Sequence, residues 1–171
     1  LDVGGGSTEW VNLNGEEVAA TRRFAQKQDA TLFMGLLAVF CVLLNRLTGQ
    51  TDVVVGTPVR GRHSPDVENV MGFFVNALPL RIRVDPSQSF VKLLAHVRGL
   101  VLEAFAAPDV PFEQLVRELD VPRDESQSAV YQAFFSFQDF RRRIVVWGEV
   151  KHDQIPLFQR GAAEDIGLWI S

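Results

Sequence analysis

Residues 70–81 read VMGFFVNALPLR and carry the clearest strand pattern of the chain. Successive side chains of extended backbone point to opposite faces, so the pattern predicts a strand from Gly72 to about Val84. One face is apolar except for a single amide, and the other face ends in two arginines. The first face comprises Phe74, Asn76, Leu78, Leu80, Ile82 and Val84, and the second comprises Phe73, Val75, Ala77, Pro79, Arg81 and Arg83.

The amide of Asn76 interrupts an otherwise apolar face. A polar group that is buried without hydrogen-bond partners costs about 1–3 kcal/mol. The Asn76 side chain is therefore expected either to clamp neighbouring backbone or to point into a cavity. The residues alone leave both interpretations open.

Composition places the chain among globular proteins. Its 171 residues are 47% hydrophobic and 22% charged, which suits one domain, or one lobe of a larger domain, with a sizeable core. A net charge of -4 argues against a nucleic-acid partner, which needs a basic surface. The short basic clusters at residues 60–63 and 141–143 are interpreted as solvated edges or local ion pairs, and the lone Cys41 as a buried, inert thiol.

Membrane and export signals are not found in the sequence. The apolar run over residues 32–44 is shorter than the roughly 20 residues that a spanning helix needs. No signal peptide is recognised, so we expect a cytoplasmic protein without a membrane partner. Because the chain lacks a start methionine, it is expected to be a piece of a longer protein, with residues 1–8 as a flexible entry segment.

Cap and turn residues divide the chain into alternating elements. Asn14 with Glu17 forms a capping-box pattern, Asp29 is the expected cap of a helix that is apolar nearly all round, and Gly49 ends that helix. The expected elements are a strand at 9–13, helices at 14–28 and 30–47, a buried strand at 52–58, a loop at 59–69, the strand to Val84, a helix from Ser87 or Ser89 to 106, a short helix with Pro111 at its first position, and strands at 130–140, 144–150 and 165–170. This order predicts an α/β two-layer sandwich, a mixed sheet with helices packed on one face.

No catalytic constellation is found among the residues. His63, His96 and His152 do not stand in a metal-binding or catalytic frame, and neither a nucleophile elbow nor a zinc-ligand cluster is present. We therefore expect no metal site and no catalytic base in this chain.

Five ordered motifs resemble one family. They are DATLFMGLLAVFCVLLNRLTG (29–49), VVVGTPVRGR (53–62), VMGFFVNALPLR (70–81), DVPFE (109–113) and RDESQSAVYQ (123–132). Together they are similar to the C-terminal half of a nonribosomal peptide synthetase condensation domain. The chain departs from that family's usual residues at Ala77, Ala107-Pro108, Ala129, Tyr131 and Glu164.

The resemblance implies a chloramphenicol acetyltransferase-like lobe of a two-lobed enzyme with a tunnel between the lobes. It implies carrier proteins that deliver thioesters on phosphopantetheine arms, with no cofactor bound directly, and an adjacent adenylation domain. Peptide-bond formation would need the family's HHxxxDG motif in the N-terminal lobe, and this chain does not contain that motif. The isolated chain is therefore expected to be inactive, and the N-terminal lobe is its expected partner.

The resemblance also implies roles for single residues. The residues expected to line the tunnel or to position substrates in it are Asn76, Gln132, Ser136 and Gln138. The alternative for Asn76 is a clamp on neighbouring backbone. The alternative for the polar strip, which we define as Gln132, Ser136 and Gln138, is plain solvent exposure. Arg62 and Arg81 are expected in ion pairs that hold the lobe, or opposite an acidic group across the cleft. The expected architectural residues are Arg62, Gly72, Phe74, Arg81, Asp109, Pro111, Phe112 and Glu113.

Two other functions stay open on the sequence. The chain is alternatively part of an epimerization or other acyltransferase domain of the same superfamily, or a non-catalytic α/β interaction module. The valine-asparagine pair Val75-Asn76 favours condensation, because the epimerization relatives depart from the pattern there.

Overall fold

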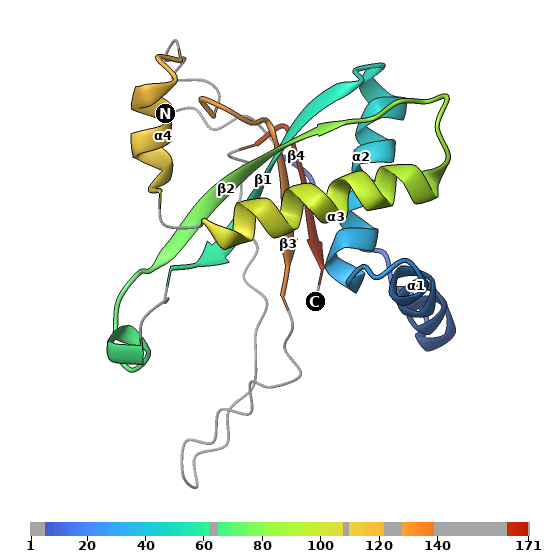
Figure 1. Cartoon of the computed structure of the whole chain (residues 1–171), viewed down its shortest axis with the longest axis horizontal. Helices are drawn as coiled ribbons and strands as arrows, with labels where there is room; N and C mark the ends of the chain where they lie inside the picture. Colours follow the sequence, from blue (N-terminus) through green and yellow to red (C-terminus); the bar gives the residue numbers. More distant parts are fainter. Residues whose placement is uncertain (1–5, 62–64, 108–109, 122–127, 139–163, 171) are drawn as a thin grey trace, which may run out of the picture.

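The computed structural model describes residues 6–61, 65–107, 110–121, 128–138 and 164–170. Four helices and four strands, with one 3-10 turn, form a mixed sheet with a helical layer (Figure 1). This α/β architecture is the one predicted. The elements are α1 (Gly15–Lys27), α2 (Leu32–Thr48), β1 (Asp52–Arg60), η1 (Pro65–Val67), β2 (Val75–Arg83), α3 (Phe90–Ala106), α4 (Phe112–Glu118), β3 (Ala133–Phe137) and β4 (Ile166–Ile170).

The sheet has the order β2-β1-β3-β4. β1 pairs antiparallel with β2 over nine residue pairs, from Asp52 opposite Arg83 to Arg60 opposite Val75. β3 runs parallel to β1, and β4 runs parallel to β3. The β-branched run Val53-Val54-Val55 thus forms an internal strand, in agreement with its continuous apolar character.

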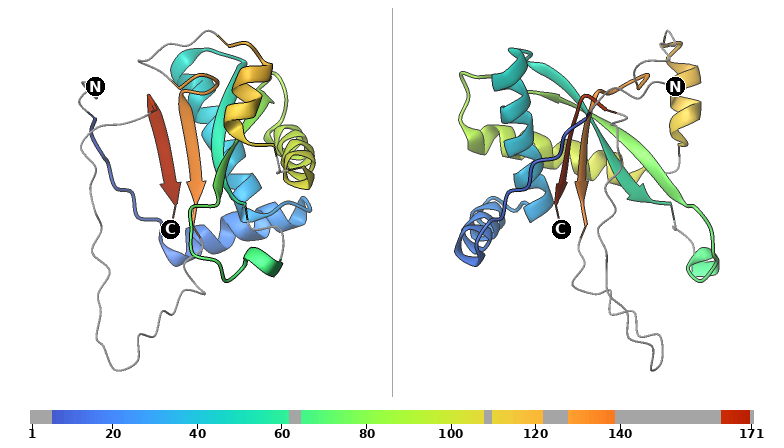
Figure 2. Two further views of the ribbon diagram at one scale, coloured as in Figure 1. Left: turned by 90° about the vertical axis from the view of Figure 1, so that its left-hand side faces the viewer. Right: turned by 180° about the vertical axis from the view of Figure 1, so that it is seen from behind.

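The core lies between this sheet and helices α2 and α3, which cross it on one side (Figures 1 and 2). The apolar face predicted for residues 74–84 turns towards these helices, and its residues from Leu78 to Val84 are buried. Phe135 of β3 is fully buried against Phe33 and Phe40 of α2, with ring centroids 5.3 and 5.9 Å away. The other face of the sheet, which we call the open face, points away from α2 and α3.

The first two helices follow their sequence signals with one correction. Asn14 accepts hydrogen bonds from the backbone N–H groups of Glu16 and Glu17, and the Glu17 side chain accepts from the Asn14 N–H, which completes the capping box. Asp29 does not cap α2, so that prediction was wrong. Asp29 has a left-handed backbone with φ of 52°, and Thr31 caps the helix instead by accepting from the Met34 N–H.

α2 is also less enclosed than its sequence suggests. It buries Leu37, Phe40 and Leu44, but Val39, Leu43 and Leu47 are exposed on its outer side. A helix that is apolar all round was predicted to be central, whereas α2 lies in the outer layer of a two-layer structure. Its C-terminus does end at Gly49, which has φ of 72°.

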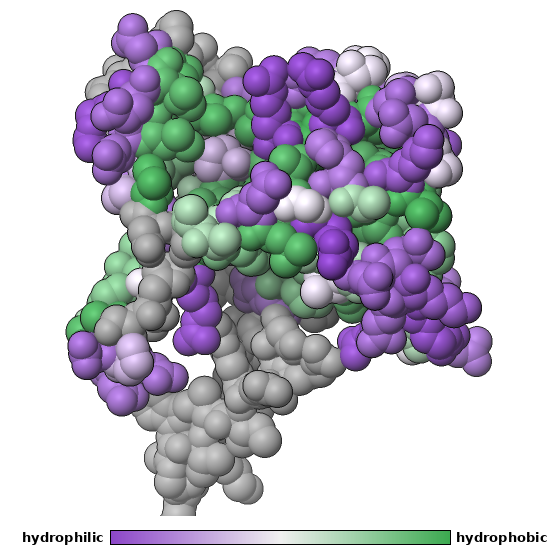
Figure 3. Space-filling view, viewed as in Figure 1, coloured by the Kyte–Doolittle hydropathy of each residue, from purple (hydrophilic) through white to green (hydrophobic). Residues whose placement is uncertain are grey.

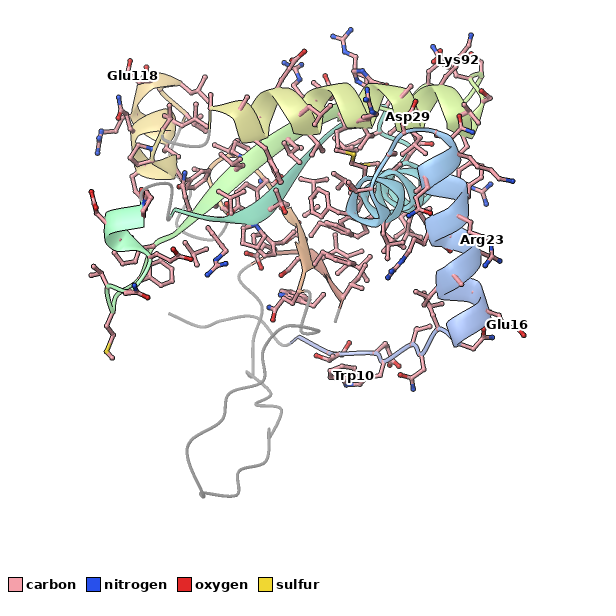
Figure 4. All side chains as sticks on the ribbon, turned by 60° about the horizontal axis from the view of Figure 1, so that its bottom comes forward. Trp10, Glu16, Arg23, Asp29, Lys92 and Glu118 are labelled. Carbon is pink, nitrogen blue, oxygen red and sulfur yellow. The ribbon has the colours of Figure 1, made fainter. Side chains whose placement is uncertain are left out.

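The strand expected at residues 9–13 is not formed. This segment is extended without ladder pairing, and Figure 4 shows Trp10 on it outside the cluster of core side chains. Trp10, Val11 and Leu13 are exposed. A strand needs a neighbour with which to pair, and no described strand pairs with this segment.

Further differences concern element ends. Of the two predicted caps of α3, Ser89 is the one used, and Leu102 and Phe105 of this helix are exposed. Pro111 is the N-cap of α4 and not its first helical residue. β3 is limited to residues 133–137, and the strand expected at 144–150 lies outside the described residues.

The described helices were compared with the length of a bilayer. No single one is long and apolar enough to cross a membrane. α1 and α2 reach that length only when taken together, and they are bent by 100° where they meet.

Candidate functional site

Asn76 is hydrogen-bonded to the segment that starts α4. Its Nδ2 donates to the carbonyl oxygen of Val110 at 2.9 Å, and its Oδ1 accepts from the backbone N–H of Phe112 at 3.1 Å. Both ends of the amide thus bind main-chain groups more than 30 residues away in sequence. This geometry is a clamp between β2 and α4, one of the two arrangements expected for the amide on an apolar face.

Four aromatic rings continue from this clamp in a series that we call the aromatic ladder: Phe112, Tyr131, Phe134 and Trp169. Successive ring centroids are 5.4, 6.0 and 6.1 Å apart, within the range of stabilising aromatic pairs. Phe134 and Trp169 belong to the open face, because their neighbours in β3 and β4 point into the core. The ladder therefore links α4 to the edge strand β4.

Small residues make room for two of these rings. A Cβ added to Gly56 would lie 2.5 Å from the Tyr131 ring, and a Cβ added to Gly167 would clash with the Trp169 ring. Elsewhere on the open face, Ala77 and Pro79 of β2 lie beside Pro58 and Gly56 of β1. The part of the open face that these residues form therefore has small, uncharged side chains, and the aromatic rings are the large side chains beside them.

The expected polar strip is only partly exposed. Gln132 and Gln138 are exposed, whereas Ser136 is only 2% exposed. The Gln132 amide donates to the carbonyl oxygen of Ser128 at 3.2 Å. These residues share the open face with Phe134, on the side of the sheet opposite the helices.

Arg81 forms an ion pair at the far end of the same face. Its Nη2 lies 2.7 Å from Oδ2 of Asp52, and its Nε lies 3.0 Å from Oδ1, so the guanidinium binds the carboxylate with two nitrogens. Arg83 approaches the same carboxylate at 4.0 Å. The pair joins β1 to β2 near the sheet edge.

The pKa of the Asp52 carboxyl lies below its ordinary range, and the largest cause is the hydrogen bond that Arg81 donates. A lowered folded-state pKa stabilises the fold above the ordinary Asp pKa, and this contribution is lost as pH falls through the folded value. We expect Arg81→Gln to raise the Asp52 pKa towards its ordinary value, measured by carboxyl 13C NMR titration. Arg83→Gln is the matched control with the smaller effect, and an unchanged Asp52 pKa in Arg81→Gln would contradict the pairing.

Replacing Asn76 tests the clamp. Asn76→Ala leaves the Val110 carbonyl and the Phe112 N–H without this partner and should lower the free energy of unfolding by about 1–2 kcal/mol. Asn76→Asp still accepts from Phe112 but sets a carboxylate oxygen, which has no proton to donate, against the Val110 carbonyl oxygen, so we expect a loss at least as large as that of Asn76→Ala. Urea denaturation of the three proteins measures this order. Equal stability of all three would show that the amide does not hold α4.

The remaining motif residues have architectural positions where they are described. Gly72 lies against the Phe74 ring, where an added Cβ would approach to 3.0 Å. Pro111 and Phe112 begin α4, and Glu113 lies in its first turn, where an acidic side chain favours the helix dipole. Arg62 and Asp109 lie outside the described residues.

Chemical groups suited to catalysis are sparse in the described part of the chain. No group of three His, Cys, Asp or Glu side chains there is placed to hold a metal ion. Burial raises the pKa of Cys41 to about 12, so this thiol stays protonated. A pocket of about 330 Å³ between α1, α2 and α3 is lined by residues without titratable side chains: Ala20, Thr21, Phe24, Gly35, Val39 and Phe90.

The aromatic ladder was not predicted from the sequence. Gly56 inside a β-branched run was a signal for it, because a strand glycine often marks a close approach. Tyr131 and Glu164, two of the departures from the family pattern, also interact. Burial and the Glu164 charge raise the Tyr131 pKa, and burial raises the Glu164 pKa.

Known proteins are similar to this chain in sequence. A family model described as condensation domain matches residues 5–157. Tyrocidine synthase 3 of Brevibacillus parabrevis is 38% identical over 147 residues, which is 86% of this chain and 2% of that protein. Phosphinothricin tripeptide synthetase PhsC of Streptomyces viridochromogenes is 43% identical over 129 residues, which is 75% of this chain and 12% of that protein. The chain thus spans a small part of these relatives.

Solved structures share the fold. The first condensation domain of the calcium-dependent antibiotic synthetase, in complex with a substrate analogue, matches 74% of this chain and 28% of its own, with a TM-score of 0.65 and 29% identity. The condensation domain from the monacolin K polyketide synthase MokA matches 74% of this chain and 30% of its own, with a TM-score of 0.69 and 30% identity. The ordered motifs, the mixed sheet and these relatives lead to one conclusion: the chain belongs to the condensation-domain family.

Proposed function

We propose that this chain is a single unit, the C-terminal lobe of a nonribosomal peptide synthetase condensation domain that joins two carrier-bound thioesters through a peptide bond. The single observation that carries the proposal is the family match over residues 5–157, in a chain that spans 28–30% of two solved condensation domains. The condensation domain acts with an N-terminal lobe, with carrier proteins that bear phosphopantetheine, and with an adenylation domain. We place it in the cytoplasm.

In this proposal the lobe supplies walls and positioning. The reaction joins the amine of one tethered substrate to the thioester carbonyl of another, and tethering converts a bimolecular encounter into an oriented one. The part of the open face beside the aromatic ladder suits a wall of such a passage because its paired residues in β1 and β2, Gly56 with Pro79 and Pro58 with Ala77, are uncharged. Gln132, Ser136 and Gln138 are proposed to contribute its polar groups.

Asn76 is proposed as a positioning residue that acts through the clamp. Its two hydrogen bonds fix the start of α4, from which the Phe112 ring packs on Tyr131. Tyr131 in turn lies over Gly56 and beside Phe134. A loosened clamp would shift the ladder and with it the passage. For Arg81 we propose a structural role, the ion pair with Asp52 that joins β2 to β1.

The proton transfer of the reaction is assigned to the other lobe. A general base must lie within hydrogen-bond reach of the proton that it abstracts. Cys41, the thiol of this chain, is buried with a raised pKa, and the HHxxxDG motif is not part of the sequence. This division of work explains why the chain carries the family's fold signals without a catalytic histidine pair.

The test uses the condensation domain in which the N-terminal lobe precedes this chain, with two loaded carrier proteins. We expect an amide-linked product on the acceptor carrier, read by mass spectrometry of the released thioester. Chiral chromatography of the donor amino acid runs in parallel. Inversion at the donor α-carbon without any amide product would overturn condensation in favour of epimerization.

A further inference from the structure

The beginning of strands β3 and β4 brings a carboxyl group to one end of the aromatic ladder. Ala133 of β3 pairs with Ile166 of β4, and the Ile166 N–H donates to the carbonyl oxygen of Gln132 at 3.3 Å. The same parallel register puts residue 164 beside residue 131, two positions before that pair. Glu164 therefore lies next to Tyr131, at the end of the sheet where β3 and β4 begin.

Glu164 is a half-buried carboxyl group. Burial raises its pKa, and no lysine or arginine charge among the described residues lowers it. After burial, the Glu164 charge is the next cause that raises the Tyr131 pKa, which agrees with the neighbouring places of the two residues in the register. A half-buried carboxylate has lost part of its hydration, and a cation bound beside it would offset that loss.

Aromatic rings lie beside this carboxyl group. Tyr131 is 7% exposed and is held between Phe112 and Phe134, with ring centroids 5.4 and 6.0 Å away. Figure 3 shows hydrophobic surface on the side of α4 that is turned to the sheet, which shelters the Phe112 end of the ladder.

Trp169 provides the exposed end of the ladder. Its ring lies back over Gly167, where an added Cβ would clash with it, and so it leans towards the start of β4. It is 59% exposed, so one face of the indole is open to a ligand. The carboxyl group and an accessible ring therefore border the same part of the open face.

This combination has the chemistry of an ammonium site. A carboxylate accepts hydrogen bonds from an ammonium group, and aromatic faces attract a cation that lies within about 6 Å of the ring centroid. A hard metal ion would instead need several oxygen ligands. In the described part of the chain, no three His, Cys, Asp or Glu side chains are placed to supply them. An organic cation therefore fits this place better than a metal ion.

We propose that Glu164, Tyr131 and Trp169 form a subsite for a basic aminoacyl side chain that ends in an ammonium group. The inference rests on the proposed function, in which the open face is a wall of the passage for tethered thioesters. Glu164 accepts a hydrogen bond from the ammonium group, and the rings contact the cation and its methylene stem. Glu164 and Tyr131 are two of the positions at which the chain departs from the family pattern, so the subsite is a property of this chain.

The test is a competition in the two-lobed domain between carrier proteins loaded with lysine and with norleucine, which has the same chain length without the ammonium group. The mixture is offered first at the donor and then at the acceptor position, and mass spectrometry gives the ratio of the two amide products. We expect lysine to be preferred by about tenfold or more at one of the positions, and Glu164→Gln to remove most of this preference. Equal use of lysine and norleucine at both positions would overturn the inference.

Variants identify the residues responsible. Trp169→Ala should remove part of the preference for lysine, because it deletes the accessible ring. Glu103→Gln is the matched control, since it removes one charge from an exposed position on α3 in the helical layer. If Glu103→Gln lowers the product ratio as much as Glu164→Gln does, the subsite is not at Glu164. If Glu164→Gln lowers both products equally, a cation of the other lobe is its partner and the inference is wrong.

A binding measurement separates this inference from the proposed reaction. The Glu164 carboxyl is titrated by 13C NMR in the two-lobed domain, in n-butylammonium chloride and in sodium chloride of equal concentration. A cation bound beside a carboxylate lowers its pKa, so we expect a lower Glu164 pKa in butylammonium. That result without amide product from any pair would support the subsite and remove the reaction. Amide products without a preference for lysine would remove the subsite and leave the reaction.

Discussion

Phe135→Ala is expected to lower the free energy of unfolding of the chain by about 3–5 kcal/mol. The Phe135 ring is fully buried at the centre of the sheet-helix interface, between Phe33 and Phe40. Its removal leaves a cavity that rings fixed on one helix do not refill. Urea denaturation followed by far-UV circular dichroism measures the loss.

Phe137→Ala is the matched control for this prediction. Phe137 follows on the same strand face but is only half-buried, near the end of β3, with its ring 6.4 Å from Phe33. It should therefore cost clearly less than Phe135→Ala. Equal losses would mean that the core is not centred on Phe135 as described.

Gly56→Ala should destabilise the chain by about 1–3 kcal/mol through overpacking. The new methyl group would meet three atoms of the Tyr131 ring at 2.5–2.7 Å. Tyr131 is 7% exposed and is packed between Phe112 and Phe134, so it does not swing out without losing both contacts. Urea denaturation gives the magnitude, and NMR shifts of the Phe112 ring protons report the displaced ladder.

Gly167→Ala makes the same change against a different ring. Its methyl group would meet Trp169, which is 59% exposed and has solvent to move into. We expect a small effect there. If Gly167→Ala lowers the free energy of unfolding more than Gly56→Ala does, Tyr131 is not the tightly packed ring of the aromatic ladder that we describe.

Much of the fold was predictable because its signals are local. Alternation from Phe74 to Val84 identified the buried face of β2, and Asn14 with Glu17 identified the start of α1. The prediction that Asp29 caps α2 was wrong because aspartate is suited both to capping and to a left-handed backbone. In the structure Asp29 has the left-handed backbone and does not cap the helix. The strand predicted at residues 9–13 was wrong because a short sequence segment does not show whether a pairing partner lies beside it.

The site was less predictable because its contacts are distant in sequence. Asn76 stood out as a polar residue on an apolar face, but its partners at Val110 and Phe112 depend on how α4 returns to β2. The ladder requires rings from α4, β3 and β4 together with a glycine from β1. Spacing along one strand gives no information on such an arrangement. The function was predicted from the family resemblance, whereas the fold was predicted from the residue patterns.

The features of the chain fit one division of work. The chain holds a four-stranded sheet with the aromatic ladder on its open face, and a clamp that fixes α4. Its sequence does not contain the HHxxxDG motif that the family resemblance associates with catalysis. In the proposed function, the chain forms a wall of a site whose proton transfer belongs to the other lobe.

The most direct measurement of this claim is amide formation by the 171-residue chain alone, beside the two-lobed domain, with the same pair of loaded carrier proteins. We expect amide-linked thioester from the two-lobed domain and only the background rate from the chain alone. Amide product from the chain alone, at a rate comparable with that of the two-lobed domain, would contradict the claim.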